Sequence, residues 1–191
     1  MQLEQSFALP FALAAAWPAF ADVPLLVSCM PGAVLQGEPR SVEGGADIDL
    51  TFTVKLGPIT GAFQGRGEVR RDELAHSGTF AGAGADRKSG SRVKGEAKFA
   101  LTATGAAETR VDIEVNYSLT GALAQFSRGA IVQELAAALT RDFAANLRAR
   151  IAAGQLPGDA PAAPEESRPL DAGRLIWRAV GARLRGGEKK D

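Results

Sequence analysis

The chain contains very few of the residues that most often carry catalysis or bind metal ions. Among 191 residues there is one cysteine, Cys29, and one histidine, His76. A single cysteine excludes a disulfide framework and a cysteine-rich metal site, so we expect Cys29 to be a small buried apolar residue. A catalytic triad would need His76 in a pocket, but Asp72-Glu-Leu-Ala-His-Ser-Gly78 is typical of a hairpin turn. We therefore expect His76 to be an exposed turn residue.

An excess of one charge is also missing, and aromatic residues are scarce. Lys and Arg number 22, Asp and Glu number 22, and aromatic residues make up 6% of the chain. This composition does not indicate nucleic-acid binding, because there is neither a basic excess nor enough aromatic surface for base stacking. The two ends nevertheless differ. Residues 1–39 contain no Lys or Arg, whereas residues 168–191 contain seven cations and three anions.

The N-terminal segment resembles an export signal but lacks its charge. Residues 6–21 are apolar and end in Ala19-Phe-Ala21, which fits a signal-peptidase site, yet no cation precedes them and Glu4 does. Pro10 and Pro18 interrupt the stretch, which is also too short for a transmembrane helix. We expect a strand over residues 2–8, a short helix over about 11–20, and a cytoplasmic folded domain.

Alternating residues then predict an antiparallel sheet. Residues 25–30 form a short helix that Pro31 and Gly32 end, and residues 46–56 alternate between apolar and polar side chains. Further strands are predicted over residues 59–69, 74–83, 92–103 and 108–121. The sum is a curved sheet of six or seven strands with long hairpins.

A long amphipathic helix follows the last strand. Its apolar stripe recurs in steps of three and four, and consists of Val132, Leu135, Leu139, Phe143, Leu147 and Ile151. The opposite face is polar, so the helix is expected to lie on the sheet. A strand, two short helices, an antiparallel run and a closing helix is the order of the α+β helix-grip fold.

Five short motifs carry a more specific resemblance. They are Cys29-Met-Pro-Gly-Ala33, Lys55-Leu-Gly-Pro-Ile59, Phe63-Gln-Gly65, Gly121-Ala-Leu-Ala-Gln-Phe-Ser-Arg-Gly129 and Asp142-Phe-Ala-Ala-Asn-Leu147. Together, over residues 1–153, they resemble the family of the carbon monoxide dehydrogenase subunit CoxG. The sequence departs from the family pattern in two places. The segment before Trp17 lacks the usual charged residues, and Ser127 stands where the family often has glycine. Both departures bear on the mouth of the cavity that a helix-grip fold leaves between its sheet and its last helix.

The resemblance implies a non-catalytic accessory protein. The family is similar in fold to the START-related lipid-transfer and polyketide cyclase (SRPBCC) superfamily and accompanies molybdenum hydroxylases such as aerobic carbon monoxide dehydrogenase. It implies attachment of that enzyme to the inner face of the cell membrane. It also implies a quinone, menaquinone or ubiquinone, as a ligand in place of a tightly bound cofactor.

The residues themselves agree with an apolar cavity between sheet and helix. The expected lining comprises Phe52, Phe63, Phe80, Phe99 and Leu119 from strands, Val132, Leu135, Leu139 and Phe143 from the helix, and Gln125, Phe126 and Arg128 at the rim. Asn116 is a further polar candidate. The alternative is that these apolar side chains fill an ordinary core, and that Arg128 pairs with a carboxylate at the helix start.

The C-terminal region is predicted to be a linker and a basic segment. Residues 154–169 have the Pro, Ala and Glu content of a flexible linker, and residues 170–191 form a basic amphipathic tail. A helix over residues 171–185 would be about 22 Å long, too short to cross a bilayer but able to lie in its interface. The predicted contacts with anionic lipid are Arg174, Ile176, Trp177, Arg178, Val180, Arg183, Leu184 and Arg185.

Alternatives remain open at this point. The tail helix can instead dock on a partner protein or on its own domain. The whole chain can be a lipid or isoprenoid carrier unrelated to a molybdenum enzyme, which predicts a ligand that co-purifies. A cyclase-like enzyme would need an acid or base inside the cavity, where the predicted strand positions are nearly all apolar.

Overall fold

The computed structural model describes residues 1–56, 59–126, 130–154 and 170–171. In chain order the elements are β1 (Gln2–Leu9), α1 (Leu13–Ala21), α2 (Val23–Cys29), β2 (Ala33–Leu35), β3 (Arg40–Val42), β4 (Gly45–Leu56), β5 (Ile59–Asp72), β6 (Ser77–Asp86), β7 (Ser91–Gly105), β8 (Glu108–Thr120), the 3₁₀ helix η1 (Ala122–Phe126), α3 (Ala130–Ala152) and β9 (Leu170–Asp171). The order confirms the predicted α+β helix-grip architecture.

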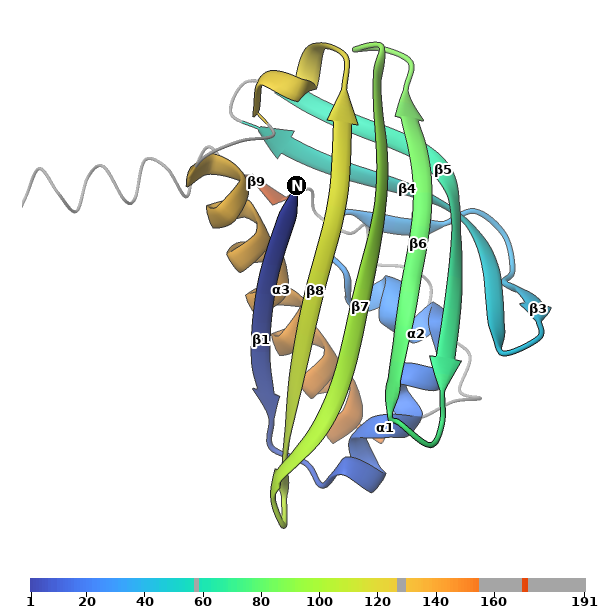
Figure 1. Cartoon of the computed structure of the whole chain (residues 1–191), viewed down its shortest axis with the longest axis vertical. Coiled ribbons are helices and arrows are strands. Elements are labelled where there is room, and N and C mark those ends of the chain that lie inside the picture. The colour runs from blue at the N-terminus through green and yellow to red at the C-terminus, as the bar shows by residue number, and fades with distance from the viewer. Residues whose placement is uncertain (57–58, 127–129, 155–169, 172–191) are drawn as a thin grey trace, which may run out of the picture.

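One curved sheet forms most of the molecule. Seven strands follow one another in the order β1-β8-β7-β6-β5-β4-β2, and β3 and β9 pair with β4. All these pairs are antiparallel except that of β9 with β4. The sheet bends around α3, and α1 and α2 lie on the same side of it (Figure 1). We call that side the inner face and the opposite side the outer face.

Alternation along the strands decides which side chains reach the core. On β8, Val111 is fully buried while its neighbour Arg110 is exposed. The same parity continues across the sheet, because Ile113 lies opposite Gln5 of β1 and Phe99 of β7. Both Ile113 and Phe99 pack against the buried cluster around α1 and α3.

The N-terminal segment belongs to the folded core. Asp22 caps α2 by accepting a 2.9 Å hydrogen bond from the amide of Leu25. In α1, Ala16 and Ala19 are completely buried, and the rings of Trp17 and Phe20 stack with centroids 6.5 Å apart. Residues 6–21 thus form β1 and α1, which supply one wall of the core.

Cys29 is buried as predicted, at the end of α2. Its side chain has no exposed surface. Burial raises the pKa of its thiol above the ordinary range, so the thiol remains protonated at neutral pH. Its backbone oxygen accepts a 2.9 Å hydrogen bond from Nδ2 of Asn146, which ties α2 to α3.

Three local features differ from the sequence-based expectations. β2 and β3 were not expected, and each has only three residues, too few to show an alternating pattern. The third predicted strand begins at Ser77 rather than Leu74, because the preceding residues form a turn. His76 lies in that turn but is half-buried rather than exposed, since its ring meets Trp17 edge to face at 5.2 Å.

Only two residues of the predicted C-terminal tail, Leu170 and Asp171, are among the described residues. Leu170 and Asp171 pair in parallel with Val54 and Lys55, so these two residues form a strand instead of the start of a helix. The predicted linker beyond residue 154 and the predicted lipid contacts from Arg174 to Arg185 lie outside the described residues.

Candidate functional site

The candidate site is the region where the first half of α3 lies over the inner face of the sheet. The apolar stripe of α3 changes character along the helix. Phe143, Leu147 and Ile151 are buried, whereas Val132 and Leu139 are only half-buried. The second half is held by the ring of Phe7, which meets Phe143 edge to face at 6.0 Å. The apolar stripe is therefore less completely covered along the first half of α3 than along the second.

Aromatic rings on the inner face lie along the sheet. A Cβ atom at Gly67 would overlap the ring of Phe80, and one at Gly78 would overlap the ring of Phe99. Glycine at these positions therefore lets each ring lie across the neighbouring strand.

The upper end of this region is formed by a separate cluster. Val54, Phe63 and Leu123 are its buried members, and Phe52, Val93, Leu119, Phe126 and Leu135 pack against them. The hydroxyl oxygen of Ser91 accepts a 3.0 Å hydrogen bond from the amide of Leu123 and so fixes η1 at the end of the sheet. This places Phe126 in the cluster, directly before α3.

The predicted lining residues do not form one group. Phe52, Phe63, Leu119, Phe126 and Leu135 meet in the cluster just described. Phe80 packs with a second cluster that includes Ile48 and Val69, whereas Phe99 and Phe143 belong to the core around α1. Sequence reasoning missed Val54, Val93 and Leu123, although the alternation of β4 and β7 places the first two on the inner face.

The polar candidates at the rim are largely displaced. Gln125 is exposed on η1 rather than packed in the cluster, and Arg128 lies outside the described residues. Asn116 lies on the outer face, where its Nδ2 donates a 2.9 Å hydrogen bond to Glu114. That prediction was wrong because Asn116 alternates with Val115 and Tyr117, which face inward.

Tyr117 is a polar inward-facing residue that the sequence analysis did not select. Its hydroxyl donates to the sulfur of Met1 at 3.7 Å, and burial raises its pKa. A tyrosine with a raised pKa is neutral at physiological pH, so it offers a hydrogen-bond donor rather than a base. A Cβ at the neighbouring Gly95 would lie 3.4 Å from Cβ of Tyr117, so the two residues share a face of the sheet. Tyr117 has the same parity on β8 as buried Val111, so this is the inner face.

Two further properties concern the described part of the chain. No group of three or more His, Cys, Asp or Glu side chains within it is arranged to hold a metal ion. None of its helices has both the length and the apolar character needed to cross a bilayer.

Most of the described chain matches one known protein family. Residues 6–152 match the family model described as the carbon monoxide dehydrogenase subunit CoxG. The chain belongs to the CoxG family. Curated protein sequences include no match to it.

Solved structures share the fold of this CoxG-family chain at low sequence identity. A conserved protein from Geobacillus kaustophilus is 17% identical with a TM-score of 0.65, over 81% of this chain and 97% of that one. A START superfamily protein from Mycobacterium smegmatis is 14% identical with a TM-score of 0.51, over 80% and 97%. The resemblance to START-like proteins expected from the sequence is confirmed.

The same fold also occurs in an enzyme. A norcoclaurine synthase variant from Thalictrum, solved with a transition-state analogue, is 14% identical with a TM-score of 0.55, over 81% of this chain and 96% of that one. Fold similarity alone therefore does not separate an enzyme from a non-catalytic protein. An enzyme of this fold is distinguished from a non-catalytic protein by the side chains between the sheet and α3.

Proposed function

We propose that this CoxG-family chain is a non-catalytic accessory protein of a carbon monoxide dehydrogenase-type molybdenum hydroxylase, and that it holds a quinone between its sheet and α3. The family assignment supports the partner. The contrast along α3 supports the ligand, because Val132 and Leu139 of its apolar stripe are half-buried while Phe143, Leu147 and Ile151 of the same stripe are buried.

A quinone suits both kinds of surface in this space. Its isoprenoid chain requires apolar walls, and its ring carries two carbonyl oxygens that accept hydrogen bonds. Tyr117 supplies a neutral hydroxyl on the inner face. A thioether sulfur is a weak acceptor, so exchange of Met1 for a quinone carbonyl is favourable.

The basic tail supports recruitment to the cytoplasmic face of the membrane. Trp177 suits the headgroup region, and the cations between Arg174 and Arg185 attract anionic lipid. One such segment gives weak, reversible attachment. A protein that binds the membrane reversibly and carries a quinone would link oxidation by the enzyme to respiration.

Mass spectrometry of solvent extracts from the purified full-length protein tests the ligand. We expect a quinone at a stoichiometry that is reduced in Leu139→Trp, because the larger ring fills the space. Ala137→Trp adds the same ring on an exposed position of the same helix and should leave the amount unchanged. A phospholipid or free isoprenoid in the extract would favour the alternative of a lipid carrier, and equal quinone content in both variants would contradict the site.

The hydrogen-bond donor has its own test. Tyr117→Phe removes the hydroxyl and retains the ring, so binding of a short-chain quinone should weaken about tenfold with little change in stability. Equilibrium titration followed by quenching of tryptophan fluorescence measures this. Unchanged affinity would remove Tyr117 from the binding site.

Sedimentation with vesicles tests the membrane contact. The full-length protein should pellet with phosphatidylglycerol vesicles at low salt and be released at high salt. Arg174→Glu with Arg178→Glu should abolish pelleting. The matched control is Arg92→Glu with Lys94→Glu, which makes the same charge change on exposed positions of β7. Equal loss in both pairs would show a nonspecific charge effect.

A further inference from the structure

The turn between β5 and β6 presents one apolar side chain to solvent. Leu74 is 95% exposed, whereas the next most exposed large apolar residue of the described chain, Met1, is 47% exposed. The turn lies beside α1, at the opposite end of the sheet from η1 (Figure 1). An isolated surface leucine needs no explanation by itself, so the significance of Leu74 depends on how the turn is held.

Three sets of contacts fix the turn. Oδ1 of Asp72 accepts hydrogen bonds from the amides of Leu74 and Ala75, at 3.0 and 2.9 Å. Oε2 of Glu73 accepts a 2.6 Å hydrogen bond from the indole nitrogen of Trp17. His76 adopts a φ of 47°, which few residues other than glycine favour, and its oxygen accepts from the amide of Leu101.

These contacts hold Leu74 in place before any partner arrives. Leu74 itself contributes only its backbone amide to them, so its side chain is not required for the fold of the turn. An apolar side chain on a preorganised backbone loses little conformational freedom when it is buried by a partner. That is the property of an anchor residue in a protein interface.

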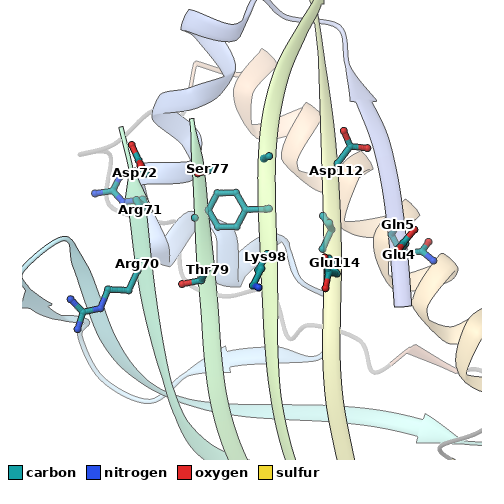
Figure 2. Close-up of a pocket in the computed structure, with 14 residues that line it drawn as sticks. Glu4, Gln5, Arg70, Arg71, Asp72, Ser77, Thr79, Lys98, Asp112 and Glu114 are labelled. Atoms are coloured by element: carbon teal, nitrogen blue, oxygen red, sulfur yellow. The ribbon is translucent and has the colours of Figure 1, made fainter. Parts of the chain in front are cut away.

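A hollow on the outer face adjoins the turn. Its volume is about 620 Å³, and Asp72 and Ser77, which flank the turn, are part of its wall. Within the described chain, its lining comes from the strands and not from α1, α2 or α3. Figure 2 shows Arg70, Thr79, Lys98 and Glu114 on four successive strands across this hollow. A protruding leucine and a hollow thus lie side by side on one surface.

The walls of the hollow carry opposite charges. The wall formed by β1 and β8 contains Glu4, Asp112 and Glu114, and that formed by β5 and β7 contains three cations, Arg70, Arg71 and Lys98, and one carboxylate, Asp72. Glu4 and Glu114 lie directly opposite one another in the strand register. Lys98 of β7 lies opposite Glu114 on its other side and so balances one of these two carboxylates, and a cation from a partner would complement the other.

We propose that Leu74 and this hollow form the docking surface for the partner enzyme. The inference rests on the proposed function, because it takes the carbon monoxide dehydrogenase-type enzyme as the occupant. A partner that fits this surface must offer an apolar pocket for Leu74 and charged side chains of both signs opposite the hollow. A protein surface provides that combination, whereas an anionic bilayer presents one sign and is repelled by Glu4, Asp112 and Glu114.

Binding of the full-length protein to purified carbon monoxide dehydrogenase holoenzyme from the same organism, measured by biolayer interferometry, tests the inference. Leu74→Glu should raise Kd at least about tenfold, because it places a charge in the apolar pocket of the enzyme. Lys98→Glu should raise Kd about threefold or more by removing the positive wall. Val34→Glu is the control, since Val34 is 41% exposed on β2, away from the hollow.

The outcomes separate the docking surface from the proposed function. All three variants should keep the thermal midpoint of the native protein, because the substituted side chains are exposed. Unchanged enzyme binding by Leu74→Glu would overturn the docking surface and leave the partner intact. Absence of enzyme binding by the native protein would overturn both. Loss of vesicle binding by Leu74→Glu, with unchanged enzyme binding, would assign Leu74 to the membrane instead and overturn the inference.

Discussion

The indole nitrogen of Trp17 donates a 2.6 Å hydrogen bond to the carboxylate of Glu73 and thereby joins α1 to the turn between β5 and β6. Glu73 also lies 3.5 Å from Nη1 of Arg71. The carboxylate is therefore shared between a helix and a strand. This relationship connects the buried core around Trp17 to an exposed turn.

A double-mutant cycle measures the strength of that connection. Trp17→Phe and Glu73→Ala should each lower the free energy of unfolding, and their coupling energy should be about 0.5 to 1 kcal/mol because the carboxylate is largely exposed to solvent. Urea unfolding of the two single variants and the double variant gives the value. Strictly additive effects would show that the hydrogen bond contributes nothing to stability.

The two halves of α3 should respond differently to the same substitution. Leu147 is fully buried, so Leu147→Ala should lower the free energy of unfolding by about 3 kcal/mol. Leu139 is half-buried beside the proposed quinone site, so Leu139→Ala should cost about 1 kcal/mol. Equal losses in urea unfolding would mean that the first half of the helix is packed as tightly as the second.

Alternation and helical periodicity were enough to predict most of the fold. β4 and β8 have 12 and 13 residues, so a period of two is well sampled along each of them. β2 and β3 could not be found in this way, because three residues contain hardly one repeat. Their existence depends on pairing with β4, a contact between distant parts of the chain.

The candidate site was harder to predict than the fold. The stripe on α3 correctly gave the side of the helix that faces the sheet. It could not distinguish covered Phe143 from partly exposed Leu139, because that difference depends on where Phe7 and the helices α1 and α2 pack. The inward position of Tyr117 was available from the alternation of β8, and the same pattern excluded Asn116.

Gly67, which lies against the ring of Phe80, gives a third prediction. Gly67→Ala should lower the free energy of unfolding by about 2 kcal/mol, because the added methyl group overlaps the ring and forces it off the sheet. The displaced ring should also reduce the space for a quinone. Gly105→Ala is a matched control, since its Cβ would meet only Cβ of Glu108 at 3.8 Å. Thermal unfolding and ligand content should change together in Gly67→Ala; a change in neither would contradict the packing of Phe80.

The turn that begins at Asp86 gives a pH-dependent prediction. The hydroxyl of Ser89 and the amide of Lys88 donate hydrogen bonds of 2.7 and 2.9 Å to its carboxylate, and they lower the pKa of Asp86, the hydroxyl most strongly. A lowered pKa in the folded state stabilises the protein fully above the ordinary carboxyl pKa of about 3.9, and this stabilisation is lost as the pH falls through the lowered value.

Urea unfolding between pH 2 and pH 6 tests this dependence. Asp86→Asn should show a smaller loss of stability on acidification than the native protein, because an amide does not titrate in this range. Ser89→Ala should show an intermediate loss, since it removes the hydrogen bond with the largest effect on the pKa. Identical pH profiles for the native protein and Asp86→Asn would exclude a contribution from this carboxylate.

The pairing of β9 with β4 fixes how far Asp171 lies from the turn that carries Leu74. Asp171 lies beside Lys55, which is opposite Thr60 of β5, and the same strand continues for 12 residues to Asp72 at the turn that carries Leu74. At about 3.3 Å per residue this stretch of β5 is about 40 Å long. Asp171, which precedes the segment predicted to contact lipid, therefore lies roughly one strand length from the proposed docking surface at Leu74. Under the two proposals made above, the sheet would act as a spacer as well as a binding wall.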